Sequence, residues 1–142
     1  VGVLFLSARI FRRFDARAVL ALAILSAALR WWVTALFVDN LAILMLAQAT
    51  HALSFGAFFA AGMQLLARFF PGPMNGHGQG VFYGLASGCG GVLGALLAGL
   101  AWQSSGRVAF AISGFIALAG AFIAWRWLLR APQDARIARS LP

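Results

Sequence analysis

The chain has 142 residues, of which 63% are hydrophobic and 10% are charged, and its mean hydropathy is +0.90. A soluble domain has about 25% charged residues, and a chain this short could not bury so much apolar surface in a single core. The net charge of +8 comes from arginines in short gaps between apolar runs, so it indicates membrane topology and not a nucleic-acid partner.

Four apolar stretches are long enough to cross a bilayer, which takes about 20 residues of helix. They cover residues 16–37, 41–69, 80–102 and 108–128, and we expect residues 9–130 to form one four-helix transmembrane region. A shorter apolar run at 1–8 begins without Met and reads as the end of a truncated fifth helix. Because of its prolines and glycines, the gap 70–79 cannot be helical throughout, and 131–142 reads as a polar cytoplasmic tail. The predicted fold class is an all-α membrane protein.

Arginine positions predict the orientation of these spans. Basic residues gather in alternate gaps, while the other two gaps carry only Arg107 and Asp39. By the positive-inside rule the basic side is the cytoplasm. We therefore expect a multi-pass protein of the bacterial cytoplasmic (inner) membrane with its C-terminus in the cytoplasm. The residues that define the basic side are Arg9, Arg12, Arg13, Arg17, Arg68, Arg126, Arg130, Arg136 and Arg139.

The span 80–102 is dense in small residues. Glycines recur at helical spacing along it, and such a face lets two helix backbones approach closely within lipid. We expect this face to pack against, and rock on, another helix. The residues concerned are Gly84, Gly88, Gly91 and Gly94.

The span 41–69 carries the polar residues that are candidates for a site. Gln48, His51 and Ser54 are spaced by three and lie broadly along one face. His51 falls near the bilayer midplane, where an ionisable group is expensive and usually faces a cavity. It could contact solute or protons, since histidine changes charge near neutral pH, or it could be a neutral imidazole bonded to a neighbouring helix. Both interpretations remain open from the sequence.

Arg30 lies inside the span 16–37. We expect its side chain to extend toward the outer interface beside Trp31 and Trp32; the alternative is an ion pair with an acidic residue in the missing part of the protein. The two histidines and one cysteine are isolated, so no metal site or cofactor is expected. Three aspartates without any glutamate leave little for acid–base catalysis, so an enzyme is not expected.

Several motifs together resemble the major facilitator superfamily, specifically the end of helix 8 and helices 9–12, and within it the branch of phenylpropionate permeases and nucleoside:proton symporters. They are Leu29-Arg30-Trp31, Gln48-x-x-His51-Ala52-x-Ser54-Phe55-Gly56, Phe70-Pro71, and Gly78-Gln79-Gly80-Val81-Phe82-Tyr83 with the glycines that follow. The resemblance implies that 41–69 and 80–102 border the central cavity, whereas 16–37 and 108–128 face lipid. The superfamily's loop motif survives only as Arg9, Arg12 and Arg13, so a charge-relay gate there is not expected.

The resulting hypothesis is that the chain is part of a proton-coupled permease for a small organic solute, such as an aromatic acid or a nucleoside. Its partners would be the lipid bilayer, the solute, protons and the missing N-terminal helices of the same transporter, and no nucleic acid. The alternative is a stand-alone four-helix membrane protein with a scaffolding or assembly role.

Overall fold

The computed structural model describes residues 14–128, apart from the side chains of Leu53, Trp127 and Leu128. Every regular element in this part of the chain is helical, which confirms the all-α prediction. The expected end of a fifth helix at 1–8 and the tail at 131–142 lie outside the described residues. The elements are α2 (Ala16–Leu36), α3 (Leu41–Phe69), the 3₁₀ turn η1 (Gly72–Met74), α4 (Asn75–Tyr83), the π-helical turn η2 (Gly84–Cys89), α5 (Gly90–Trp102), α6 (Gly106–Ile123) and the π-helical turn η3 (Ala124–Leu128).

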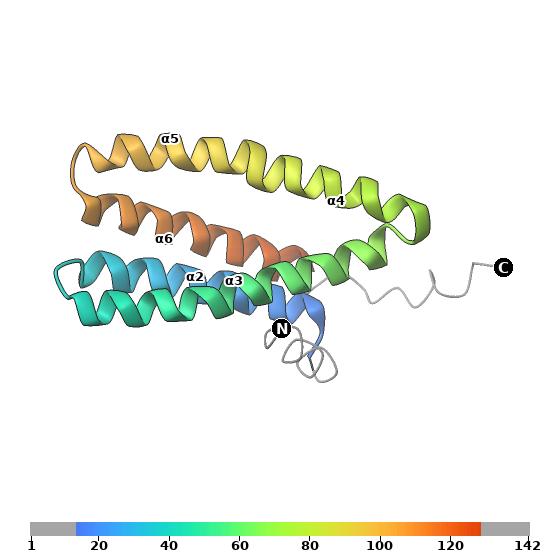
Figure 1. The fold of residues 1–142 in the computed structure, drawn as a ribbon, viewed down its shortest axis with the longest axis horizontal. Coiled ribbons are helices and arrows are strands. Elements are labelled where there is room, and N and C mark those ends of the chain that lie inside the picture. The colour runs from blue at the N-terminus through green and yellow to red at the C-terminus, as the bar shows by residue number, and fades with distance from the viewer. Residues whose placement is uncertain (1–13, 129–142) are drawn as a thin grey trace.

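These elements form four rods that are long and apolar enough to cross a membrane. The spans are Ala16–Leu36, Leu41–Phe69, Gly72–Trp102 and Gly106–Arg126. They run up and down in chain order, so the turns after α2 and α5 lie at one end of the bundle and the turn after α3 lies at the other (Figure 1). This alternation agrees with the alternating distribution of arginines along the sequence.

The third rod begins earlier than residue 80, where the sequence places its start. Gly72 has φ of 63°, a left-handed conformation that glycine adopts without strain. Pro73 then falls within the first residues of η1, where its missing N–H costs no hydrogen bond. The chain therefore turns at Pro71–Gly72 and is helical again from there. The expectation that 70–79 cannot be helical throughout is confirmed, but the break is confined to Phe70 and Pro71 and the helix resumes well before residue 80.

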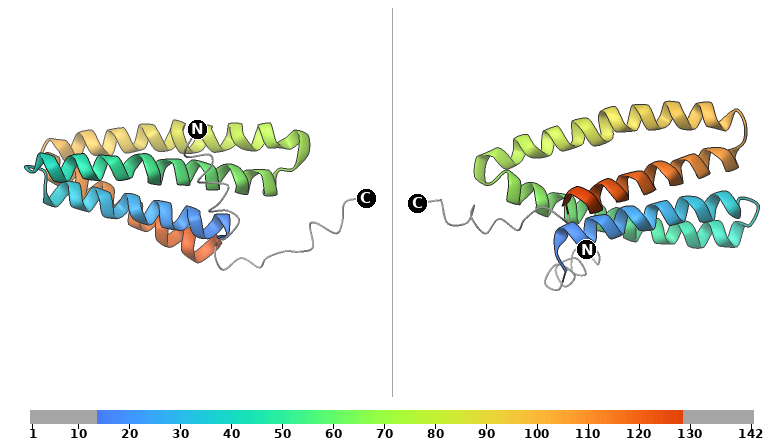
Figure 2. Two further views of the ribbon diagram at one scale, coloured as in Figure 1. Left: turned by 60° about the horizontal axis from the view of Figure 1, so that its bottom comes forward. Right: turned by 180° about the vertical axis from the view of Figure 1, so that it is seen from behind.

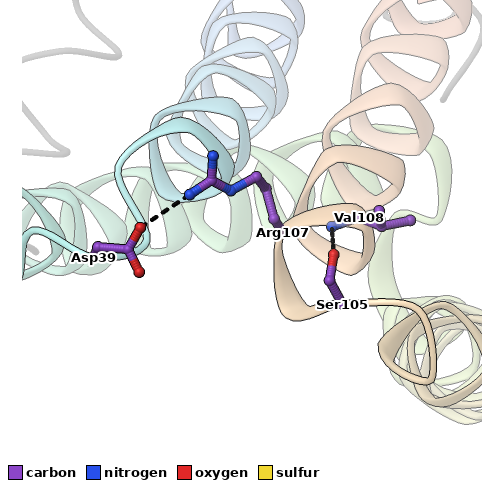
Figure 3. A network of polar contacts seen from close by, with 4 residues as sticks. All are labelled: Asp39, Ser105, Arg107 and Val108. Atoms are coloured by element: carbon purple, nitrogen blue, oxygen red, sulfur yellow. Dashed lines mark hydrogen bonds and ion pairs between the residues drawn. The ribbon is translucent and has the colours of Figure 1, made fainter.

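Side-chain caps fix the α2–α3 turn and the α5–α6 turn, which lie at the end of the bundle opposite to the α3–α4 turn. Asn40 accepts a hydrogen bond from the Ile43 backbone N–H at 3.2 Å, which starts α3. The Ser105 hydroxyl oxygen accepts from the Val108 N–H at 3.1 Å, which starts α6 (Figure 3). Such caps satisfy backbone donors that the first turn of a helix leaves free.

Helix α2 lies between α3 and α6 and packs along both (Figures 1 and 2). The residues buried at these contacts are mostly alanines, among them Ala23, Ala28 and Ala35 of α2 and Ala109 and Ala121 of α6. Small side chains let helices approach closely, and this packing drives association in lipid, where apolar surface alone does not.

Two tryptophans of α2 interlock with α6. The Trp31 ring stacks on Phe110 with centroids 5.6 Å apart, and Trp32 meets Phe115 edge-on at 4.6 Å. Gly114 lies against the Trp32 indole so closely that a Cβ at this position would overlap the ring. The α2–α6 contact therefore includes one glycine packed directly against one indole.

The rod formed by α4, η2 and α5 is the least enclosed. In the most apolar 18-residue stretch of this rod no residue is buried. In the corresponding stretches of the α2 and α6 spans, 28% and 22% of the residues are buried. A Cβ added at Gly84, Gly88, Gly91 or Gly94 would meet nothing within 4 Å. The small face predicted on this span thus has no neighbour among the described residues, and its packing role remains a prediction.

An ion pair links elements at each end of the bundle. At the end with the α2–α3 turn, Arg107 donates to Asp39 at 3.0 Å (Figure 3). At the other end, Arg68 donates to Asp15 at 3.2 Å and joins the end of α3 to the start of α2. Both pairs are exposed to a considerable degree, so each contributes little to stability and mainly fixes the helix ends.

Candidate functional site in a cavity between α2 and α3

A partly open cavity of about 200 Å³ lies between α2 and α3. Helix α2 lines it with Ala23, Ile24, Ala27 and Arg30, and helix α3 with His51, Ser54, Phe55 and Phe58. Three of the eight residues have polar side chains, but the surface that lines the cavity is almost entirely apolar. A concave, mostly apolar lining within two membrane spans is typical of small-molecule sites.

The spacing along each helix explains why these residues share one cavity. Residues 23, 27 and 30 fall on one face of α2, and 51, 55 and 58 fall on one face of α3. At about 1.5 Å per residue, Arg30 lies about 9 Å below the end of α2, and His51 lies about 15 Å from the start of α3. The polar groups are therefore well inside the apolar layer.

Arg30 is the buried charge of this site. Only 8% of its surface is exposed. Its Nη1 donates to Gln48 Oε1 at 3.3 Å, and its Cζ lies 4.2 Å from the centroid of the Trp31 ring. Its Nε is buried and has no hydrogen-bond partner among residues 14–128.

These contacts correct the expectation for Arg30. The side chain does lie beside Trp31, but it turns toward α3 and not outward to the interface. The reason is local: the hairpin of α2 and α3 brings Gln48 to the same depth, and its amide oxygen accepts a hydrogen bond that lipid could not offer. The alternative, an ion pair with an acidic residue in the missing part of the protein, stays a prediction.

The predicted polar residues of α3 gather around this arginine. His51 and Ser54 line the cavity, and Gln48, itself an exposed residue, accepts a hydrogen bond from the guanidinium. The Ser54 hydroxyl donates to the His51 carbonyl at 3.1 Å, which leaves its oxygen free to accept. The His51 imidazole makes no hydrogen bond to any other residue in 14–128, and its ring lies 5.5 Å from that of Phe55.

Aromatic rings extend from the cavity toward α4. Phe55 and Phe59 lie 4.6 Å apart, and Phe59 stacks on Tyr83 at 5.9 Å. Phe58 approaches Phe82 at 6.3 Å. Because Phe82 and Tyr83 directly precede η2, this cluster connects the cavity lining to the π-helical turn where the glycine-rich part of the third rod begins. The glycines Gly84, Gly88, Gly91 and Gly94 themselves are not among the residues that line the cavity.

Sequence reasoning treated Arg30 as an interfacial anchor and missed it as part of the site. A usable signal was present, because Arg30 and Gln48 are equally distant along the chain from Asp39 in the turn. Two antiparallel helices joined by a tight turn bring such residues to the same depth. No group of His, Cys, Asp or Glu that could hold a metal ion occurs within the described part of the chain.

Comparison with known families decides the class of protein. The model of the MFS_1 like family matches residues 1–112 of the chain. The chain belongs to the MFS_1 like family. No curated protein and no solved structure matches it.

Membership of the MFS_1 like family confirms the resemblance to the major facilitator superfamily and indicates a membrane transporter, not an enzyme. The four apolar helices agree with that class and with a lipid environment. The similarity to phenylpropionate permeases and nucleoside symporters stays a prediction.

Proposed function

We propose that these four helices are helices 9–12 of a proton-coupled permease that takes up a small organic solute, such as an aromatic acid or a nucleoside. The observation that carries the proposal is the cavity between α2 and α3, which combines Arg30, His51 and Ser54 with two phenylalanines inside the membrane. Ionisable groups at this depth are retained in transporters where they line solute or proton paths.

Each side chain has a chemical role in this proposal. His51 has an imidazole without a neighbouring hydrogen-bond partner in 14–128, so it is free to exchange a proton or to contact solute. Ser54 and Gln48 offer neutral hydrogen-bonding groups, and Phe55 and Phe58 offer an apolar surface for a carbon skeleton. The glycines Gly84, Gly88, Gly91 and Gly94 would let the third rod rock against a helix of the other half of the transporter.

The arrangement of charges supports an orientation. Arg68 lies at the end of the bundle where α2 begins. In the sequence, the arginine-rich segments 9–17 and 126–139 come at the start of the first described span and at the end of the last one. By the positive-inside rule this end faces the cytoplasm of a bacterial inner membrane, with the C-terminus on the same side.

Uptake by the full-length transporter in proteoliposomes tests the role of His51. Transport of a panel of radiolabelled aryl carboxylates and nucleosides is measured with and without an imposed pH gradient. We expect His51→Ala to lower proton-driven uptake at least tenfold and to flatten its dependence on pH, since the imidazole to which the proposal assigns contact with protons is removed. The matched control is His77→Ala, because His77 is exposed at the start of α4 and outside the cavity. Wild-type uptake and pH profile in His51→Ala would refute the proposal.

The MFS_1 like family match favours a transporter over a stand-alone scaffold. A measurement of solute uptake distinguishes the transporter from the scaffold. A scaffold would show no uptake even when the full-length gene is expressed, whereas a permease transports once its remaining helices are present.

A further inference from the structure

Arginines outnumber aspartates at the end of the bundle where α2 begins. Arg17 lies in the first turn of α2, Arg68 lies near the end of α3, and Arg126 lies in η3. The acidic residue that the structure describes at this end, Asp15, is bonded to Arg68. At the opposite end, an ion pair matches one cation with one anion. The described part of the bundle therefore carries an excess of positive charge at the end where α2 begins.

Arg17 lies on the face of α2 that packs against α6. Residues seven apart on a helix are two turns apart and so share a face. Ile24, seven residues on, lies beside Gly120 of α6, since a Cβ on that glycine would be 3.8 Å from Ile24 Cγ2. Trp31, after seven more residues, stacks on Phe110 of α6. Because α2 also contacts η3, which continues α6, Arg17 belongs to the junction between α2 and η3.

Arg126 stands at the same height on the other side of this α2–η3 junction. Helices α2 and α6 run in opposite directions, and Ile24 lies beside Gly120 (Figure 1). At about 1.5 Å per residue, Arg17 lies about 10 Å from Ile24 toward the end of the bundle, and Arg126 lies about 9 Å beyond Gly120 in the same direction. Arg126 is exposed and Arg17 is half-buried. Two cations therefore stand at nearly the same height on neighbouring helices.

An exposed aromatic pair lies on the membrane side of Arg126. Phe122 precedes Arg126 by one turn, and Trp125 precedes it directly. The two ring centroids are 5.8 Å apart, and 58% of the Phe122 surface and 46% of the Trp125 surface remain exposed. Cations at the helix end and aromatic rings next to them match a molecule with an anionic head at the interface and an apolar chain in the bilayer.

We propose that the α2–η3 junction binds an anionic phospholipid, with its phosphate on Arg17 and Arg126 and an acyl chain along Phe122 and Trp125. Arginine binds phosphate oxygens through parallel N–H···O bonds. Basic pockets between membrane helices bind anionic headgroups in the same way. The inference concerns the lipid around the protein, so it depends neither on the identity of a solute nor on proton coupling.

Native mass spectrometry of the purified protein in detergent micelles tests the inference. The probes are dioleoylphosphatidylglycerol, which is anionic, and dioleoylphosphatidylcholine, which is zwitterionic and has the same acyl chains. We expect the first phosphatidylglycerol to bind at least tenfold more tightly than phosphatidylcholine. Equal affinities would overturn the inference, and this comparison needs no variant protein.

Substitutions then assign the preference to the junction. One arginine beside an anionic headgroup strengthens binding about fivefold. We therefore expect Arg17→Gln and Arg126→Gln each to weaken phosphatidylglycerol binding by about this factor, while phosphatidylcholine binding changes less than twofold. Arg126→Lys should retain most of the affinity, because it keeps the charge. Wild-type affinity for phosphatidylglycerol in both glutamine variants would overturn the inference.

The matched control is Arg68→Gln, which removes the same charge from the same end of the bundle. Arg68 belongs to α3, which packs on α2 away from η3 (Figures 1 and 2). We expect this variant to change phosphatidylglycerol binding less than twofold. A loss as large as that in Arg126→Gln would mean a diffuse attraction to the whole basic end, and would overturn a site at the α2–η3 junction.

A competition experiment distinguishes a phospholipid from a soluble phosphate ester. Glycerol 3-phosphate offers a phosphate without acyl chains. We expect it not to displace bound phosphatidylglycerol at equal concentration, because it lacks the apolar contact with Phe122 and Trp125. Displacement would show that the junction takes free phosphate esters, and would overturn the assignment to a lipid.

Discussion

The contact of Gly114 with Trp32 gives a sharp test of how α2 and α6 pack. A Cβ at Gly114 would overlap the indole of Trp32, whereas a Cβ at Gly120 on the same helix would lie 3.8 Å from Ile24 Cγ2, an ordinary contact. The pair Gly114→Ala and Gly120→Ala therefore compares the same chemical change with and without a steric conflict.

The magnitude follows from two opposing terms. Replacing glycine by alanine in a helix stabilises it by about 0.5–1 kcal/mol, and this gain applies to both variants. Overpacking a tight contact costs about 1–3 kcal/mol, and this cost applies only at Gly114. We expect Gly114→Ala to lower the free energy of unfolding by about 1–3 kcal/mol relative to Gly120→Ala.

Titration of the purified protein with SDS in mixed micelles, followed by circular dichroism, measures the free energy of unfolding. Combining Gly114→Ala with Trp32→Ala completes a double-mutant cycle, and we expect the cost at Gly114 to disappear once the indole is gone. Equal effects of the two glycine variants, or an undiminished cost without Trp32, would show that this packing is not what holds α2 to α6.

Two further predictions concern the bundle end and the small face. Asp39→Asn, which removes the exposed ion pair with Arg107, should change the free energy of unfolding by less than about 1 kcal/mol in the same titration, since exposed pairs are weak; a loss of several kcal/mol would mean that this pair secures the bundle. Gly88→Leu should leave the packing of α2, α3 and α6 intact, because a Cβ there meets nothing within 4 Å. It should nevertheless lower uptake by the full-length transporter at least tenfold if the small face packs against another helix. Val92→Leu, at an exposed position of α5, is the control, and equal uptake by both variants would contradict the role given to the small face.

The sequence by itself determined the fold class and the presence of the four membrane spans that the structure describes. Long apolar runs separated by polar turns can form only helices in lipid, since each backbone hydrogen bond must be made within its own segment. The bounds of α3, Leu41–Phe69, agree with the sequence prediction because Asn40 and Pro71 mark its ends locally. The polar set Gln48, His51 and Ser54 was also visible, because its spacing depends on one helix alone.

Tertiary structure decided what those polar residues face. Whether Arg30 extends to the interface or turns inward depends on which residue of the next helix lies at its depth, and Gln48 provides an acceptor there. The cavity, the close contact of Gly114 with Trp32 and the central place of α2 are likewise relations between helices. In lipid such relations follow from shape and a few hydrogen bonds, which hydropathy does not report. For that reason the four spans were predicted from the sequence, whereas the packing of α2 on α3 decided that Arg30 is buried beside Gln48.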